Sequence, residues 1–306
     1  MEDFQESPNS VSTPLVELRK KAKDNVPMLI EGFLKQYRGK KVYYQPNMGN
    51  GGDALIAAGA FQLLQKAGVD YEIIEDVEKV NLEDQVVFYP GGGNLVDEYT
   101  NCADFLRRFH RVAREIVILP HTVKGNEELL KSLGGNVTIF CREHNSYEYL
   151  QSLGLHCHVW LDHDLAFSLD LARCNGQTAT PMIAYLQVLA KKYLLGSGKR
   201  PVLHAFRTDV EKTGIDLPVD NVDVSSRINH NYLMFPEPDV FKTVSDIFRF
   251  IGYFEEVHTN RLHIGIAGAL AGKKVFLHPN SYWKNRAIYE YSLKGRFSNV
   301  EFVEGE

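Results

Sequence analysis

Cysteine is scarce in this chain, and the few cysteines are not spaced as a known motif. The four residues Cys102, Cys141, Cys157 and Cys174 include no CxxC pair. The dense cysteine framework of a small secreted protein is therefore missing, and we expect reduced thiols and a cytoplasmic protein. The first 14 residues are polar and acidic, and we expect them to form a loose arm. They do not have the basic start and apolar core of a secretory signal.

Long hydrophobic runs and excess positive charge are also missing. The most apolar stretch, residues 264–272, is far shorter than the ~20 residues that a membrane-spanning helix needs, so we expect no integral membrane segment. Lys and Arg number 34 against 39 Asp and Glu, which gives a net charge of −5 and disfavours a nucleic-acid partner. With 306 residues, 44% of them hydrophobic, the chain suits about two globular domains with a large core.

Short apolar runs alternate with amphipathic helical patterns along most of the chain, which predicts βα units and mainly parallel sheets. A helix is expected at 16–35. The first series then has predicted strands at 41–45, 71–75, 86–89, 116–119, 137–141 and 158–161, with helices at 54–67, 95–114 and 146–153. After the linker-like residues 196–201, the second series has strands at 201–206, 256–258 and 274–277 and helices at 241–254, from Arg261 and from Tyr282. We therefore expect an α/β protein of two lobes, residues 1–175 and 176–306, with a cleft between them and the last helix packing back on the first lobe.

Ligands of such folds bind beyond the carboxyl ends of strands, so the turns there are the first places to look for a site. Residues 47–53 (NMGNGGD) are rich in glycine but fit neither GxGxxG nor GK[ST], so no nucleotide-binding motif is indicated. Asp53 there either lines a site or caps the helix that follows. Residues 89–94 (YPGGGN) end in Asn94, which either caps a helix or holds a ligand hydroxyl. His121, after another predicted strand, either lines the cleft or is structural.

The second lobe places basic residues at two strand ends. Arg207 follows the strand at 201–206, and Arg261 and His263 lie in the first turn of a helix after the strand at 256–258. Two guanidinium groups, an imidazole and free helix N–H groups suit a small molecule that carries both a phosphate and a carboxylate. The alternative is that Arg261 forms a surface ion pair and His263 belongs to the core.

The stretch His156–Asp164 (HCHVWLDHD) is rich in potential metal ligands, but its spacing matches no established zinc pattern. Alternate side chains of a strand point to opposite faces, so Cys157 would point away from its neighbouring histidines. We interpret it as a structural strand with a polar turn and expect no metal.

At these residues the sequence resembles the polysaccharide pyruvyl transferase family over residues 40–295. The shared pieces are Asn50-Gly-Gly-Asp-Ala-Leu-Ile56, Gly91-Gly-Gly-Asn94, Cys141-Arg-Glu143 with Ser146, Asp162 with Asp164, Arg207 with Asp209, Arg261-Leu-His263 and Tyr282-Trp-Lys-Asn-Arg286. Each piece is weak alone, but their order and spacing together are specific.

The resemblance implies a GT-B-like fold of two Rossmann-like lobes and a reaction with phosphoenolpyruvate. A pyruvyl group is transferred to a sugar of an exopolysaccharide, or to its lipid-linked precursor, as a ketal. Roles toward phosphoenolpyruvate carry over to Arg207, Arg261, Leu262 and His263. The first lobe would hold the acceptor against Asn50, Asp53, Gly92, Asn94 and His121.

The residues fit this chemistry, with His263 as a general acid toward the enol methylene and Asp53 or His121 as the base. We expect no cofactor beyond the donor substrate, and membrane association only through the acceptor. Two alternatives stay open because folds of this kind host several functions. One is a glycosyltransferase that uses a nucleotide sugar, and the other is a catalytically silent carbohydrate-binding protein.

Overall fold

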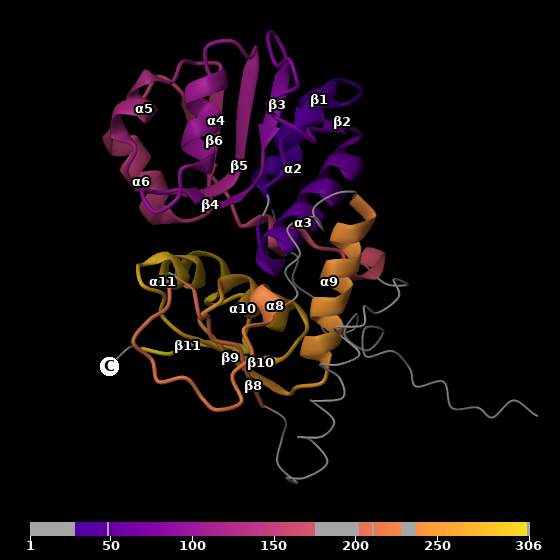
Figure 1. Ribbon diagram of the computed structural model, residues 1–306, viewed down its shortest axis with the longest axis vertical. Coiled ribbons are helices and arrows are strands. Elements are labelled where there is room, and N and C mark those ends of the chain that lie inside the picture. Colours follow the sequence, from indigo (N-terminus) through magenta and orange to yellow (C-terminus); the bar gives the residue numbers. More distant parts are fainter. Residues whose placement is uncertain (1–27, 48, 175–201, 210, 228–236, 305–306) are drawn as a thin grey trace, which may run out of the picture.

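A seven-stranded parallel sheet forms the first half of the chain in the computed structural model, which describes residues 28–47, 49–174, 202–209, 211–227 and 237–304 (Figure 1). The strand order is β2-β1-β3-β5-β6-β7, and β4 also pairs with β5. The strands are β1 (Lys41–Tyr44), β2 (Asp70–Ile73), β3 (Val86–Tyr89), β4 (Gly92–Leu95), β5 (Glu115–Val123), β6 (Val137–Cys141) and β7 (His158–Leu161). The strands β3 and β6 are buried throughout, because helices cover both faces of the sheet.

Helices lie on both faces of this sheet and bury two separate hydrophobic clusters. The first cluster involves α2 (Leu29–Leu34), η1 (Lys35–Tyr37), α3 (Gly51–Ala67), η2 (Leu165–Ser168) and η3 (Leu171–Cys174). The second involves α4 (Asn101–Phe109), α5 (Glu127–Ser132) and α6 (His144–Ser152). In α3, Asn50 accepts from the N–H of Gly52 while Asp53 accepts from the N–H of Asn50, and this capping box fixes where the helix begins.

The second half is built on a four-stranded parallel sheet of order β11-β10-β9-β8. Its strands are β8 (Val202–His204), β9 (Glu256–Thr259), β10 (Lys274–Leu277) and β11 (Val300–Phe302). The helices are α8 (Val224–Arg227), α9 (Glu237–Gly252), α10 (Leu262–Leu270), α11 (Lys284–Ile288) and the π-helical η4 (Tyr289–Leu293). Gly268 allows α10 to lie close to the sheet, since a Cβ there would come within 2.8 Å of Val275.

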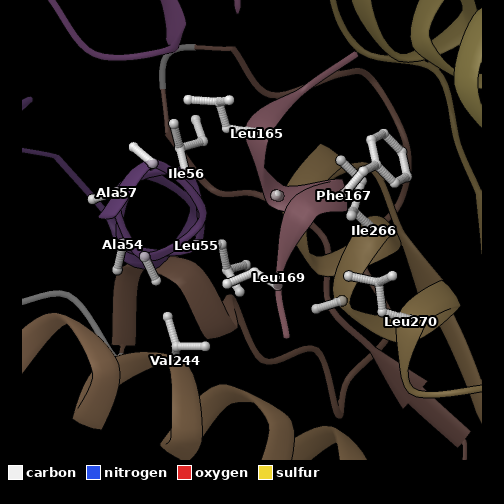
Figure 2. Close-up of a cluster of buried hydrophobic side chains, with 14 of the residues drawn as sticks. Ala54, Leu55, Ile56, Ala57, Leu165, Phe167, Leu169, Val244, Ile266 and Leu270 are labelled. Carbon is white, nitrogen blue, oxygen red and sulfur yellow. The ribbon is translucent and has the colours of Figure 1, made fainter. Parts of the chain in front are cut away.

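One hydrophobic cluster joins the two halves. Figure 2 shows Leu55 of α3, Phe167 of η2, Val244 of α9 and Ile266 of α10 gathered in it, all of them buried. Helix α9 lies beside α3 (Figure 1), so the N-terminal end of α3 is held against the second half. This packing brings the strand ends of both sheets to the same place.

The expectation of an α/β protein with mainly parallel sheets is confirmed, and several predicted boundaries need correction. Residues 92–95 form β4, and α4 begins only at Asn101, so the turn at 89–94 does not lead into a helix as predicted. Helix α3 begins at Gly51, three residues before the predicted start. The expected arm, the linker at 196–201 and the lobe boundary at 175/176 lie outside the described residues. Within the described ranges, no helix is both long and apolar enough to cross a membrane.

Candidate active site

A cavity of about 210 Å³ lies where the carboxyl ends of strands from both sheets meet. Eight of the nine residues predicted from the sequence line it. From the first half these are Asn50, Asp53, Gly92 and Asn94, and from the second half Arg207, Arg261, Leu262 and His263. Residues that lie far apart in the chain therefore share one cavity at the strand ends, as expected for α/β folds.

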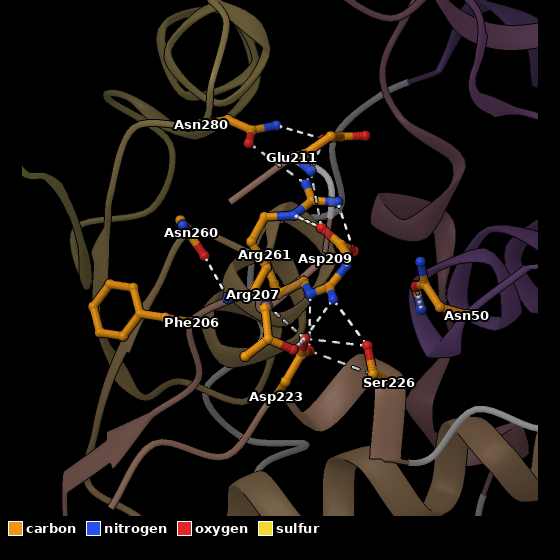
Figure 3. Close-up of polar contacts among 12 residues, drawn as sticks. Asn50, Phe206, Arg207, Asp209, Glu211, Asp223, Ser226, Asn260, Arg261 and Asn280 are labelled. Atoms are coloured by element: carbon orange, nitrogen blue, oxygen red, sulfur yellow. Dashed lines mark hydrogen bonds and ion pairs between the residues drawn. The ribbon is translucent and has the colours of Figure 1, made fainter. Parts of the chain in front are cut away.

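Arg207, after β8, is held by two carboxylates (Figure 3). Its Nε and Nη2 donate to the two oxygens of Asp209, at 2.7 and 3.0 Å, and its Nη1 donates to Glu211. Its backbone N–H donates to the side chain of Asn260 at 2.8 Å. The guanidinium group is buried yet lines the cavity, so its plane is fixed before any ligand arrives.

Arg261, the N-cap residue of α10, is held in the same way. Its Nε and Nη2 donate to the two oxygens of Asp223 at 2.9 and 2.5 Å, and Nη1 lies 2.8 Å from Asp209. Nη2 also donates to Ser226 at 2.9 Å. Asp209 therefore bridges the two arginines, and Figure 3 shows its carboxylate between them.

The three carboxylates balance much of the positive charge in this part of the cavity. Burial alone would raise the pKa of Asp209, but the hydrogen bond from Arg207 and the charge of Arg261 outweigh it and hold that pKa below its usual range. The pKa of Asp223 is lowered for the same reason, with Arg261 outweighing burial. An incoming anion thus meets arginines that are aligned but already paired.

His263 lies in the first turn of α10, with its side chain 16% exposed on the cavity. Its Nε2 is 3.3 Å from Oδ2 of Asp164. Its Nδ1 faces Gly52, where a Cβ atom would lie only 2.6 Å from that nitrogen. Both neighbours belong to the first half, so the imidazole sits at the junction of the two halves.

Asp53 has the two roles that the sequence left open. It closes the capping box of α3 and also accepts from Nδ2 of Asn47 at 2.8 Å, while it lines the cavity. Burial raises the pKa of its carboxyl, against the opposing charge of His263. A raised pKa makes this carboxylate a better proton acceptor.

Asn94 lines the cavity from β4 and does not cap a helix. Its backbone N–H donates to Nε2 of His121 at 2.9 Å, and its Nδ2 donates to Oδ1 of Asn47 at 3.0 Å. Asn94 is only 8% exposed, and its Oδ1 has no hydrogen-bond partner within the part of the chain that the structure describes. This acceptor oxygen is itself buried, behind the cavity surface.

His121 is not on the cavity wall, contrary to the expectation. The strand β5 continues to Val123, past the predicted end at residue 119. His121 therefore lies inside the strand and is fully buried. Its Nδ1 lies 3.1 Å from the carbonyl oxygen of Pro90, and its Nε2 accepts from Asn94. Burial lowers its pKa to about 3, so the ring is neutral and serves to hold β4 in place.

Two further cations line the cavity and were not predicted as site residues. Arg142, directly after β6, is buried and donates to Oδ2 of Asp164 at 2.7 Å and to Thr122 at 2.8 Å. Lys284 of α11 donates to Glu211 at 2.8 Å, and burial lowers its pKa to about 8, although Glu211 opposes the shift. Arg142 was recognisable by its place directly after a strand. Lys284 gave no such signal, because a loop separates it from β10.

Two carboxylates of the stretch at 156–164 also accept backbone hydrogen bonds within the first half. Asp162 accepts from the N–H of Ile30 in α2 at 2.7 Å, and Asp164 accepts from the N–H of Ala166 at the start of η2 at 2.9 Å. Among the described residues, no group of three or more His, Cys, Asp or Glu side chains is arranged to hold a metal ion.

Comparisons with known proteins give a family and solved structures of similar fold. The family model described as polysaccharide pyruvyl transferase matches residues 50–282, which is most of the chain. A solved structure of a functionally uncharacterised protein from Klebsiella pneumoniae is 27% identical, with a TM-score of 0.74, over 90% of this chain and 97% of that one. A search of curated proteins found no match.

Proposed function

The chain belongs to the polysaccharide pyruvyl transferase family, and we propose that it transfers a pyruvyl group from phosphoenolpyruvate to two hydroxyls of one sugar. The product is a pyruvate ketal, and phosphate is released. The acceptor is a sugar of an exopolysaccharide or of its lipid-linked precursor, handled on the cytoplasmic side. The observation that carries the proposal is the single cavity that combines Arg207, Arg261 and Lys284 with His263.

The donor carries a phosphate and a carboxylate, and cationic hydrogen-bond donors recognise both. Arg207 and Arg261 present fixed guanidinium groups on one side of the cavity, and Arg142 and Lys284 line it as well. Charge-assisted hydrogen bonds to these groups would hold the donor with its enol carbon near His263. The bound anion would compete with Asp209 for the N–H groups of both arginines.

The first chemical step is protonation of the enol methylene. Histidine titrates near neutral pH and is suited to donate this proton, and among the described residues His263 is the histidine that lines the cavity. The methylene becomes a methyl group, and the adjacent carbon becomes an oxocarbenium-like electrophile. A sugar hydroxyl attacks that carbon and loses its proton.

The attacking hydroxyl needs a base, and we assign this role to Asp53. Its carboxylate lines the cavity from α3, close enough to His263 for the charge of the imidazole to oppose the rise in its pKa. His121 drops out of this role because it is buried and both ring nitrogens are engaged. Asn50, Asn94 and Gly92 would border the acceptor from the same side.

In the last step a second hydroxyl of the sugar attacks the same carbon and phosphate leaves. The cationic side chains would stabilise the negative charge that develops on the leaving phosphate. The proton of the second hydroxyl leaves with the phosphate, and the proton that Asp53 took from the first hydroxyl returns to the ring and restores the imidazolium. The balance therefore closes with the two substrates alone.

The test is phosphate release from phosphoenolpyruvate against a panel of sugar acceptors, with mass spectrometry for the pyruvate adduct. We expect release that depends on acceptor and is lost in His263→Ala. Near-normal release in this variant would exclude the general-acid role. Binding of a uridine-diphosphate sugar in preference to phosphoenolpyruvate would favour a glycosyltransferase, and glycan binding without any phosphate release would favour a silent binding protein.

A further inference from the structure

Asp164 connects the imidazole of His263 to the first half of the protein. Its Oδ2 lies 3.3 Å from Nε2 of His263 and accepts from Arg142 at 2.7 Å. Its Oδ1 accepts from the backbone N–H of Ala166 at 2.9 Å. The side chain is 1% exposed, so this carboxylate is a fixed and desolvated partner for the imidazole.

Charged groups surround His263. The imidazole lies in the first turn of α10, where the helix dipole adds positive charge. Arg142, after β6, adds a further positive charge nearby, while Asp53 of α3 and Asp164 before η2 are the carboxylates that face the ring. Of these two, only Asp164 lies within hydrogen-bond reach of it in the contacts recorded for the described residues.

We propose that Asp164 is the positioning residue for His263, holding Nε2–H so that proton transfer takes place at Nδ1. A carboxylate on one nitrogen fixes the tautomer and the ring orientation and stabilises the imidazolium. Nδ1 is then the nitrogen that exchanges its proton, beside Gly52 at the start of α3. Asn50 and Asp53 line the cavity at that same turn.

The contact between His263 and Asp164 makes proton transfer depend on the packing of the two halves. The imidazole comes from the second half and its carboxylate partner from the first, so the general acid is complete only when both are docked. The catalytic part of this inference rests on the proposed function. The tautomer of His263 and its contact with Asp164 do not depend on the proposed function, because both are properties of the protein without substrates.

The first experiment needs no substitution of Asp164. Imidazole ¹H–¹⁵N correlation spectra of the full-length chain, with the His263 signals identified by their loss in His263→Gln, report the tautomer above the titration midpoint. We expect the neutral ring to carry its proton on Nε2. A neutral ring protonated on Nδ1 would overturn the proposal, and it would do so even if the chain released no phosphate.

The second experiment compares Asp164→Asn with Asp162→Asn. Asp162 is a matched control because it is a buried carboxylate two residues away that accepts from the backbone N–H groups of Ile30 and His163. We expect Asp164→Asn to lower the titration midpoint of the His263 signals by about one pH unit, because a negative charge beside the ring is removed. In Asp162→Asn we expect no shift of this midpoint.

The kinetic readout separates positioning from folding. In Asp164→Asn we expect kcat to fall about 10- to 100-fold, which is a part of what a general acid contributes. The KM for phosphoenolpyruvate should stay within about threefold of the value for the original chain. The alkaline limb of the kcat profile should move to lower pH by the same amount as the midpoint. The proposal would be overturned if Asp164→Asn changed neither the alkaline limb of the kcat profile nor the titration midpoint of the His263 signals. It would also be overturned if Asp162→Asn shifted that midpoint by the same amount.

Discussion

Asp209 accepts hydrogen bonds from Arg207 with both of its carboxylate oxygens, at 2.7 and 3.0 Å. One of these oxygens also lies 2.8 Å from Arg261. The side chain of Asp209 is 35% exposed, whereas those of Glu211 and Asp223 are 9% and 6% exposed. Asp209 is therefore the carboxylate of this group that an incoming anion can displace most readily, while the other two hold the guanidinium groups in place.

We expect Asp209→Asn to strengthen donor binding. The substitution removes a negative charge that competes with phosphoenolpyruvate for the same N–H groups. The KM for phosphoenolpyruvate should fall about five- to tenfold, which corresponds to about 1 kcal/mol of binding free energy. Phosphate release at varied donor concentration measures it, and a rise in KM would show that Asp209 supports the donor instead.

The control is Asp223→Asn, which removes a carboxylate that is buried and well supported. Asp223 accepts from both the backbone N–H and the hydroxyl of Thr208, at 3.0 and 3.1 Å, as well as from Arg261. Its loss leaves the Arg261 guanidinium poorly held, so we expect the KM to rise and the melting temperature to fall. A lower KM in Asp209→Asn and a higher KM in Asp223→Asn would show that the donor displaces Asp209, whereas Asp223 holds Arg261 in place.

Gly52 makes room for the imidazole of His263, and we expect Gly52→Ala to lower activity without unfolding the protein. The new Cβ would lie 2.6 Å from Nδ1 and 3.1 Å from Cβ of His263, so the ring has to move. A displacement of about 1 Å in a reacting group costs on the order of 100-fold in rate. The same Cβ would lie 2.9 Å from Oδ1 of Asn50, the N-cap residue of α3, so we also expect a modest fall in the melting temperature.

Gly32→Ala serves as the matched control for this change. Gly32 lies within α2, and a Cβ there would have nothing within 4 Å. This variant should keep full phosphate release. Equal activity in both variants would mean that the ring of His263 has room to spare, and the general-acid geometry described above would then be wrong.

Most of the fold could be predicted because the period of the hydrophobic residues separates strands from helices. Strands β3, β6 and β10 have the predicted bounds. The sequence did not predict β4 or β11. Residues Gly92–Leu95 (GGNL) have no strand pattern of their own and pair only because β5 offers an edge beyond the end of β3. Tertiary context decides such short segments.

The site residues that directly follow a strand could be predicted from the sequence. Arg207 and His263 were found by this rule, and the cavity brings them together. Their partners were not predictable, because Asp223 and Asp164 reach them through loops whose paths leave no periodic signal. The misplacement of His121 has a different cause. The strand β5 runs four residues further than its apolar run, which moves this histidine from a strand end into the sheet.

The buried His121 should make the protein sensitive to acid. The unfolded chain binds a proton on this ring near pH 6.5, while the folded chain binds it only near a pKa of about 3. Between these values the unfolded state takes up more protons, so stability is full above pH 6.5 and is lost as the pH falls. From pH 7 to pH 5 this single group should cost about 2 kcal/mol of unfolding free energy.

Urea unfolding at the two pH values measures this effect, with His121→Gln as the comparison. Glutamine can still accept from the N–H of Asn94 but does not titrate. His163 and His278 also have lowered pKa values, each about 4, and they stay in both proteins. The variant should therefore lose less stability between pH 7 and pH 5 than the original chain, by about 2 kcal/mol. An equal loss would mean that the fold does not lower the pKa of His121.

Lys284 should make donor binding weaken at alkaline pH. Burial lowers its pKa to about 8, so its positive charge disappears as the pH rises from 7 to 9. The carboxylates around it stay ionised over this range, and Tyr99, whose pKa burial raises to about 12, stays neutral. We expect the KM for phosphoenolpyruvate to rise up to about tenfold between these pH values, as one charge-assisted contact is lost.

The comparison is Lys284→Met, which keeps an unbranched side chain one atom shorter and removes the charge. Its KM should already be high at pH 7 and should stay nearly constant up to pH 9, because the titrating group is gone. The change has to appear in KM, since a loss of the general acid acts on kcat. If the variant kept the pH dependence of the original chain, the alkaline loss of binding would come from another group. Lys284 would then act only as the partner that keeps Glu211 ionised beside Arg207.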